Sequence, residues 1–420
     1  MSGIDNRRRA ENAILAVLPG RSRDLARLRI LAEGGEAPVV TVVGKYNHGK
    51  SRLLNELLGA DAFHVADTRA TVALAERIHQ GVRWMDAPGL DADVGNEDDL
   101  HALRAAWLES DIRLMVHAAR EGELDADELA LLQELHADGE HTRRQTMFVL
   151  SQVDQLEDEA ELENVGQGLR RQLPGIVVYP VSSTRHRKGA TEGKRLLLEK
   201  SGIPALKLEL KAAFGRVPSA RAHEAGLLRN GIRVELEQCL AAHAGRLVEL
   251  RDQHARQRRD FDEGLRDVLD TVQVDMLDVV NVPGPDLARV PDSAEDRFKM
   301  TPGKLERSRL QVAYSRACRA VNAYLIRQGV VELPSAQQTA AASLNTVIVA
   351  VMGISIKYRD DLRRIFCEAD GRKRLRRDFA HYYEQSSDRV ALVADMARVE
   401  SDIASVEQAL AALQTIGTKG

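Results

Sequence analysis

The chain has 420 residues, a length that suggests about two to three domains. Hydrophobic residues make up 44% and charged residues 29%, so the chain can build a sizeable core, and a fully disordered protein is excluded. Basic and acidic residues nearly balance, 59 against 63, for a net charge of −4, so a general electrostatic attraction to nucleic acid is not indicated.

The N-terminal residues 5–33 are predicted to be helical with a break at Pro19-Gly20, and they form a segment of their own over residues 1–36. A short apolar run in this segment does not predict a signal peptide, and no stretch of the chain is a convincing transmembrane span. The three cysteines lie far apart and predict small buried thiols in a reducing compartment. A cytoplasmic protein is therefore expected.

Residues 37–215 are predicted to form one α/β domain, because short apolar strands alternate with helical segments. This alternation indicates a mostly parallel sheet with helices on both faces. The predicted strands are residues 39–43, 72–78, 82–86, 112–117, 146–150 and 176–181.

Residues 216–420 are predicted to form an all-α helical stalk or bundle, because strand signals largely stop after Pro218. Apolar residues recur at helical spacing over 225–280, and a cleaner heptad pattern runs over 392–413. Four prolines indicate a loop over 281–304. We expect the two apolar stripes to pack against each other as antiparallel helices.

The strongest motif is a glycine-rich loop that fits G-x-x-x-x-G-K-[ST], placed between a β-branched strand and an amphipathic helix. In such a loop, backbone N–H groups wrap phosphate oxygens, and the following helix adds its positive dipole end. Lys50 is expected to reach the β- and γ-phosphates, and the Ser51 hydroxyl to ligate Mg²⁺. The motif predicts a nucleotide site formed by Gly44, Asn47, His48, Gly49, Lys50, Ser51 and Arg52.

A second motif, D-x-x-G, runs from Asp86 to Gly89 at the end of a predicted strand. Asp86 is expected to hold Mg²⁺ through water, and the N–H of Gly89 is expected to sense a γ-phosphate. The motif is weak by itself, but its distance of about 35 residues from the glycine-rich loop makes it informative.

With these two motifs, residues 38–215 resemble the P-loop GTPases, specifically the branch that holds Era-like and dynamin-like GTPases, including small bacterial dynamin-like proteins. The resemblance implies GTP and GDP as ligands, hydrolysis of GTP to GDP and phosphate, and Mg²⁺. Asn47 stands where some members use an asparagine to hold K⁺. The alternative for Asn47 is a residue suited to a tight turn.

The resemblance also implies two base-binding motifs. The first, normally N/T-K-x-D, corresponds to Ser151-Gln152-Val153-Asp154, and Asp154 would pair with the N1 and N2 hydrogens of guanine. Here Ser151 replaces the usual Asn or Thr, and Gln152 replaces the lysine that packs over the base. The second motif corresponds to Ser182-Ser183-Thr184, with a backbone amide near guanine O6.

A switch threonine that closes on Mg²⁺ and the γ-phosphate is implied as well, and Thr71 is favoured over Thr68 because it lies next to a predicted strand. Leu90 stands where many GTPases have a glutamine, and leucine cannot orient water. Turnover is therefore expected to be slow and to be stimulated by assembly or a partner. The expected catalytic residues are Lys50, Thr71, Gly89 and Asn47, and the expected metal ligands are Ser51, Thr71 and Asp86.

Two groups of titratable residues receive no chemical role. An acidic run after the fourth predicted strand is interpreted as a helix start that complements the helix dipole, with a metal or base site as the alternative. Three histidines show no ligand spacing and are interpreted as structural or solvated. The acidic run comprises Glu121, Glu123, Asp125, Asp127 and Glu128, and the histidines are His117, His136 and His141.

Residues 344–356 are apolar and are interpreted as a buried bundle helix, with a membrane-dipping tip as the alternative. Basic residues cluster over 357–377. This cluster is interpreted as a solvated face, with an anionic membrane surface as the second interpretation and nucleic acid or another partner as the third.

The sequence thus predicts a GTPase whose helical stalk couples the nucleotide state to self-assembly, as a dimer or oligomer, or to peripheral membrane association. The alternative is an Era-like regulatory switch that acts on a protein or an RNA or ribosome partner without membrane activity. The mixed charge of the helical half disfavours RNA.

Overall fold

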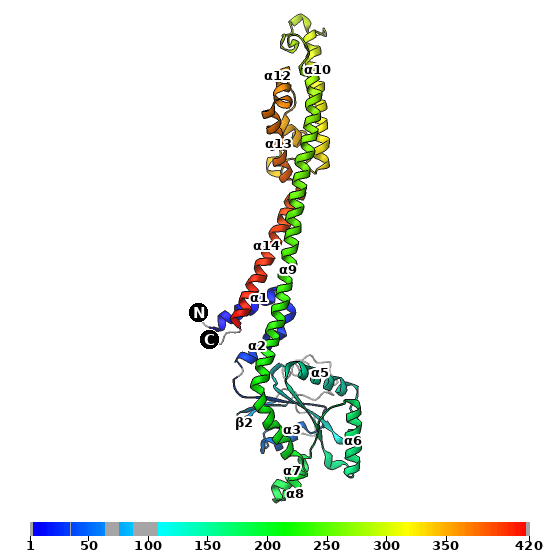
Figure 1. Cartoon of the computed structure of the whole chain (residues 1–420), viewed down its shortest axis with the longest axis vertical. Helices are drawn as coiled ribbons and strands as arrows, with labels where there is room; N and C mark the ends of the chain where they lie inside the picture. Colours follow the sequence, from blue (N-terminus) through cyan, green and yellow to red (C-terminus); the bar gives the residue numbers. More distant parts are fainter. Residues whose placement is uncertain (1–2, 34, 64–74, 87–107, 417–420) are drawn as a thin grey trace. The chain divides into compact units, whose positions relative to one another are not determined.

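The structure is a computed structural model, and it describes residues 3–33, 35–63, 75–86 and 108–416 (Figure 1). The chain divides into two compact units. The first unit comprises residues 1–237 and 408–420, and the second comprises residues 238–407.

The first unit is built on a six-stranded sheet with the order β2-β3-β1-β4-β5-β6. Strand β2 runs antiparallel to β3 and all other neighbouring strands are parallel, which confirms the prediction of a mostly parallel sheet. The strands are β1 (Val39–Val43), β2 (Ala75–His79), β3 (Val82–Asp86), β4 (Ile112–Ala118), β5 (Gln145–Ser151) and β6 (Val178–Pro180).

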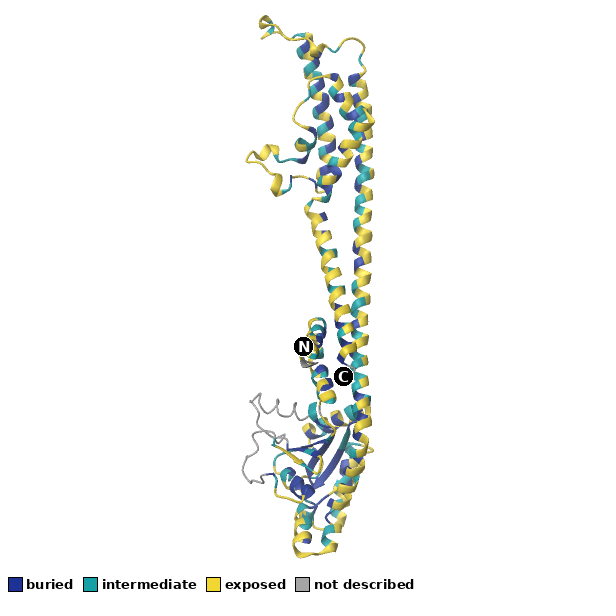
Figure 2. Ribbon diagram, turned by 90° about the vertical axis from the view of Figure 1, so that its left-hand side faces the viewer, coloured by how far each residue is buried: buried dark blue, intermediate teal, exposed yellow. Residues whose placement is uncertain are grey.

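Helices cover both faces of this sheet. Successive side chains of a strand point to opposite faces, so a strand made only of buried residues needs packing partners on both. Val42 packs on the face covered by α3 (Lys50–Leu58). The next residue, Val43, packs on the face covered by α5 (Ala126–Thr142) and α6 (Glu159–Gln172). Figure 2 shows the central strands as the dark-blue, buried part of the unit. The prediction of helices on both faces is confirmed.

The N-terminal segment forms two helices, α1 (Gly3–Val17) and α2 (Ser22–Glu33), separated by a 3₁₀ turn at Pro19–Arg21. The break predicted at Pro19-Gly20 is therefore confirmed. Two further short helices, α7 (Ser183–Glu192) and α8 (Arg195–Glu199), follow β6.

The longest helix, α9 (Ile203–Val280), has 78 residues and contains Pro218 without ending there. Its first turns belong to the sheet core, where Val217, the residue before the proline, is buried. A helix was expected to begin after Pro218, so α9 starts earlier than predicted and runs through the expected boundary. The domain limits 1–36, 37–215 and 216–420 stay a prediction.

A buried ion cluster joins α2 and α9 within the first unit. Arg27 of α2 donates to both carboxylate oxygens of Glu224 in α9, at 2.9 and 2.7 Å. Arg144, which precedes β5, donates to the same carboxylate at 2.9 Å. Burial alone would raise the pKa of Glu224, but the two guanidinium groups hold this pKa below its usual value.

The second unit is built of helices, as predicted. Its core brings the C-terminal part of α9 against α10 and α13, and the ring of Phe261 stacks on Tyr383 with centroids 4.0 Å apart. Besides α9, its helices are α10 (Pro302–Arg327), α11 (Val347–Met352), α12 (Arg359–Leu362), α13 (Ala369–Glu384) and most of α14 (Ser387–Ile416), with a π-helical turn at Arg363–Cys367. The last turns of α14, from residue 408, belong to the first unit. The loop predicted between α9 and α10 is confirmed.

Within this unit, α14 runs antiparallel to α9. Arg251 of α9 pairs with Glu400 at 2.7 Å. Farther along α9, His254 accepts from Arg389, which lies closer to the start of α14, at 2.6 Å. Residue numbers rise along α9 while those of the paired residues in α14 fall, so the two helices are antiparallel, as predicted.

The apolar segment 344–356 is only partly buried in the second unit, and Ile354 is 70% exposed. Val347 and Met352 belong to its core, and the Tyr314 hydroxyl donates to the carbonyl oxygen of Met352 at 2.5 Å. The packing of Val347 and Met352 agrees with the favoured interpretation of a buried helix, whereas residues 353–355 follow the helix and are exposed. Among the helices that the structure describes, we find none with the length and apolar character needed to cross a bilayer.

The basic cluster 357–377 is partly used for pairing within the unit. Arg359 is buried and donates to Glu306 at 2.6 Å, and Arg372 pairs with Asp270 at 2.9 Å. These contacts agree with a face whose charges are balanced by neighbouring acidic residues.

Candidate functional site

The glycine-rich loop leaves β1 with an unusual backbone. Gly44 has a φ of +147°, and a Cβ at this position would lie 2.2 Å from the carbonyl oxygen of Val116 in β4. Gly49 has a φ of +84° and directly precedes α3, and Asn47 has a φ of +60°, which asparagine tolerates better than most residues. The loop therefore lies against β4 and leads into the N-terminus of α3, as a phosphate-binding loop requires.

Lys50, the first residue of α3, is buried at the loop. Its Nζ donates to the carbonyl oxygens of Gly44 and Lys45 at 2.9 and 2.7 Å. The loop carbonyls thus hold the Lys50 ammonium group beside the loop backbone, where its positive charge can bind phosphate oxygens.

Ser51 and Asp86 meet beside the loop, since β1 and β3 are parallel neighbours with Val42 opposite Asp86. Ser51 Oγ donates to Asp86 Oδ2 at 2.5 Å. Asp86 is buried, and its Oδ1 has no hydrogen-bond partner within the described residues. Burial raises the pKa of Asp86, while Ser51 and Lys50 oppose that rise. The Ser51 hydroxyl beside the buried Asp86 carboxylate fits Mg²⁺, which prefers oxygen ligands. The charge of the ion would favour the ionised form of Asp86.

The last residue of β5 and the residue that follows it are hydrogen-bonded to the backbone of the glycine-rich loop. Ser151 Oγ donates to the carbonyl oxygen of His48 at 2.6 Å, and Gln152 Nε2 donates to the carbonyl oxygen of Asn47 at 2.6 Å. Both residues depart from the usual base-binding motif, and both contact the loop through side-chain hydrogen bonds.

Asp154 and Ser182 come together from two different loops. Ser182 Oγ donates to Asp154 Oδ1 at 2.6 Å, and Ser182 Oγ itself accepts from the backbone N–H of Arg185 at 3.0 Å. Ser183 begins α7. A carboxylate offers about four acceptor positions, so the bond from Ser182 orients Asp154 without exhausting its capacity.

The structure thus brings most of the predicted nucleotide-site residues to the ends of β1, β3 and β5 and to the loop after β6. Arg52 is exposed on α3. Thr68, Thr71, Gly89 and Leu90 lie outside the described residues.

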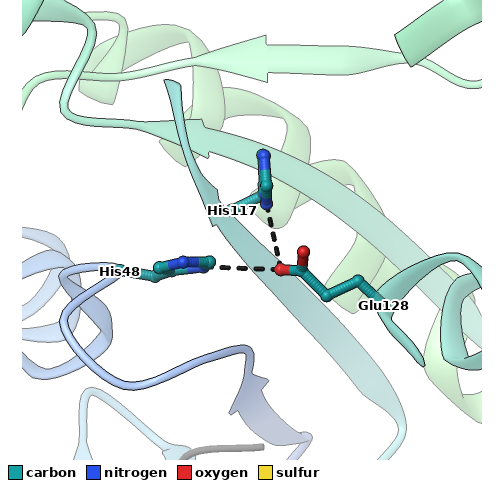
Figure 3. Close-up of side chains that lie close together, drawn as sticks. All are labelled: His48, His117 and Glu128. Atoms are coloured by element: carbon teal, nitrogen blue, oxygen red, sulfur yellow. Dashed lines mark hydrogen bonds and ion pairs between the residues drawn. The ribbon is translucent and has the colours of Figure 1, made fainter. Parts of the chain in front are cut away.

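One cluster beside the loop was not predicted (Figure 3). His48, from the glycine-rich loop, lies with its Nδ1 3.5 Å from Glu128 Oε1, and His117, from the end of β4, lies with its Nδ1 2.9 Å from the same oxygen. Asp125 caps α5, as expected of an acidic helix start, but Glu128 points into this cluster instead of solvent. The residues are too far apart in sequence for a local spacing rule to join them.

Comparison with known proteins gives two matches in sequence. Residues 39–152 match the family described as 50S ribosome-binding GTPase. An uncharacterized protein from Acinetobacter baylyi is 48% identical over 401 residues, which cover 96% of this chain and 96% of that protein.

Solved structures give weaker likenesses. An Era variant from Aquifex aeolicus bound to GDP and AlF4⁻ is 19% identical with a TM-score of 0.31. The match covers 38% of this chain and 56% of the Era chain, which is less than two thirds of its length. Toc33 from Arabidopsis thaliana in complex with Mg²⁺ and GMPPNP is 18% identical with a TM-score of 0.32, over 48% of this chain and 94% of that chain.

Proposed function

The chain belongs to the same family as the Acinetobacter baylyi protein and contains a P-loop GTPase domain, and from this premise we propose that it hydrolyses GTP and passes its nucleotide state to its helical region. The observation that carries the proposal is the contact between Ser51 and Asp86 at 2.5 Å, beside a loop that holds Lys50. These three side chains are the set that a nucleotide with its metal ion needs.

In this proposal each residue has one task. Lys50 neutralises charge on the β- and γ-phosphates, and Ser51 and Asp86 hold Mg²⁺, which offsets phosphate charge when bound. Asp154, oriented by Ser182, accepts the guanine N–H groups. Thr71 and Gly89 are proposed as the switch groups that respond to the γ-phosphate, and Asn47 as a K⁺ ligand that compensates for Leu90.

The proposed link to the helical region is α9. Residues near its start, such as Leu206 and Leu210, belong to the sheet core of the first unit. Residues near its end, such as Leu265 and Val272, belong to the core of the second unit. A change in the packing of either core therefore acts on one continuous helix. We propose dynamin-like coupling to self-assembly or to a membrane surface as the purpose of this link.

The second candidate is an Era-like switch that acts on a protein or ribosomal partner. The match of residues 39–152 to the family described as 50S ribosome-binding GTPase supports it.

Turnover and sedimentation together test both candidates. GTP hydrolysis by the full chain should need Mg²⁺ and should be absent in Lys50→Ala, which loses the charge directed at the phosphates. Unchanged affinity of Lys50→Ala for a fluorescent GTP analogue would refute the nucleotide site.

The sedimentation arm compares GDP with a non-hydrolysable GTP analogue, with and without anionic liposomes. Pelleting with the GTP analogue alone supports self-assembly, and pelleting that needs liposomes supports membrane association. Turnover without pelleting in either condition rejects dynamin-like coupling and supports the switch.

A further inference from the structure

The cluster of His48, His117 and Glu128 gathers three metal-ligating side chains from three separate elements: the glycine-rich loop, the end of β4 and the first turn of α5 (Figure 3). The three residues are deeply buried, with exposed fractions of 4%, 0% and 1%. One ligand atom from each residue lies within 4.8 Å of the other two. We propose that these residues bind a divalent transition-metal ion such as Zn²⁺, at a site that uses none of the residues assigned to Mg²⁺.

The distances suit such an ion. Ligand atoms around a tetrahedral Zn²⁺ with bonds of about 2.0–2.1 Å lie roughly 3.3 Å apart. The two contacts of Glu128 Oε1, at 2.9 Å to His117 Nδ1 and 3.5 Å to His48 Nδ1, lie on either side of that value. The ligand atoms of all three residues lie within 4.8 Å of one another. Nδ1 of His48 also lies 3.2 Å from the carbonyl oxygen of Val116, so the His48 ring has to exchange that contact for the ion.

The surroundings of His117 also match a metal ligand. Its second ring nitrogen, Nε2, lies 3.2 Å from the carbonyl oxygen of Gly122. Metal-binding histidines usually donate this second N–H to a carbonyl or carboxylate, which fixes the ring and its tautomer. The backbone thus holds the His117 ring with Nδ1 turned toward Glu128.

Both ring nitrogens of His117 face oxygen acceptors. Nδ1 lies 2.9 Å from the Glu128 carboxylate and Nε2 lies 3.2 Å from the carbonyl oxygen of Gly122. A neutral imidazole has only one N–H, so when Nε2 donates to Gly122 the contact between Nδ1 and Glu128 needs a cation. A metal ion bound to Nδ1 and the carboxylate would supply it.

The ligand types point to a transition metal and not to Mg²⁺ or Ca²⁺, since those ions prefer oxygen ligands and imidazole suits Zn²⁺, Co²⁺ and their neighbours. Lys45 Nζ lies 3.7 Å from Glu128 Oε2 and also pairs with Asp125. The positive charge of Lys45 repels a cation and therefore weakens its binding at this site. An ion here would fasten His48, and with it the glycine-rich loop, to β4 and α5.

The test measures metal binding by the full chain without nucleotide, so that it does not depend on GTP hydrolysis. We expect one Co²⁺ per chain with the intense visible absorption of a four-coordinate site, displaced by one Zn²⁺. Glu128→Gln keeps the size of the side chain and should weaken Zn²⁺ binding at least tenfold in competition with a chromophoric chelator. Lys45→Met should strengthen it several-fold.

His136→Ala is the matched control, because His136 lies on the same helix α5 but is exposed and pairs only with Glu140 among the described residues. It should bind Co²⁺ like the wild type, while His117→Ala should lose the absorption. The proposal is overturned if the wild type binds no stoichiometric Co²⁺ or Zn²⁺, or if Glu128→Gln binds them as tightly as the wild type does. Circular dichroism of each variant establishes that a loss of binding does not reflect unfolding.

Discussion

Gly44→Ala places a methyl group where the structure has no room for one. The new Cβ would lie 2.2 Å from the carbonyl oxygen of Val116, against a minimum near 3.0 Å, so the loop or β4 has to move by about 0.8 Å. The φ of +147° adds backbone strain for any residue with a side chain. Strain of this kind costs on the order of 1–3 kcal/mol, and if the loop relaxes away from its nucleotide-binding form, affinity for GDP falls by about 5- to 150-fold.

Gly59→Ala provides a matched control. Gly59 ends the helix that the glycine-rich loop begins, and it also has a positive φ, +69°, but nothing lies within 4 Å of a Cβ there. This variant should lose about 1–2 kcal/mol of unfolding free energy and keep its affinity for GDP. Titration with a fluorescent GDP analogue and thermal unfolding of both variants measure the two effects. If Gly44→Ala binds GDP within twofold of the wild type, the loop does not contact phosphate as we infer.

Further predictions concern stability, base choice and monovalent ions. Glu224→Gln removes the carboxylate that Arg27 and Arg144 share, while Asp111 still lies 3.6 Å from Arg27. The substitution should cost at most about 3–5 kcal/mol of unfolding free energy by urea denaturation; an effect below 1 kcal/mol would contradict the ion cluster. Because the pKa of Glu224 is lowered on folding, its contribution is complete above the unfolded value near ~4.3 and should be lost as the pH falls below it, which wild-type unfolding between pH 3 and 6 would measure. Asp154→Asn should shift preference from guanine toward xanthine nucleotides, and equal binding of ATP and GTP by the wild type would refute the assignment of Asp154. Hydrolysis should be faster in K⁺ than in Na⁺, and Asn47→Ala should remove the difference; equal rates in the wild type would leave the K⁺ site without support.

The sheet and the loop that leads to Ser51 could be predicted because their signals are local. Residues 39–43 are a β-branched run, residues 82–86 combine three apolar residues with Arg83 and Asp86, and both strands have the predicted bounds. Parallel neighbouring strands end at the same edge, so a glycine-rich loop after one and a carboxylate after the other must lie close together. The contact between Ser51 and Asp86 follows from that rule.

The course of α9 through Pro218 could not be predicted from local signals. A proline inside a helix destabilises the helix by roughly 3 kcal/mol or more. The sequence therefore predicts that a helix ends at or begins after Pro218. Here Ala213 and Val217 are buried in the sheet core and Glu224 is held by two arginines, so tertiary contacts fix the helix on both sides of the proline.

The cluster around Glu128 was missed for a related reason. His117 and Glu128 are 11 residues apart, and they meet only because the chain turns from β4 into α5 beside the glycine-rich loop. The acidic residues near the start of α5 suggested a helix cap, which Asp125 indeed provides. Nothing in the spacing distinguishes the one acidic side chain that turns inward.

The order of the strands has a consequence for association between copies of the chain. An open sheet exposes unpaired backbone at its two edges, which invites strands from other molecules to add to them. At one edge, β6 has three residues and ends with Pro180, which lacks an N–H to donate. At the other, β2 carries the charged side chains Glu76 and Arg77. Both edges disfavour the addition of a strand from another copy, so we expect an ordered assembly of this protein to form through surfaces other than the sheet edges.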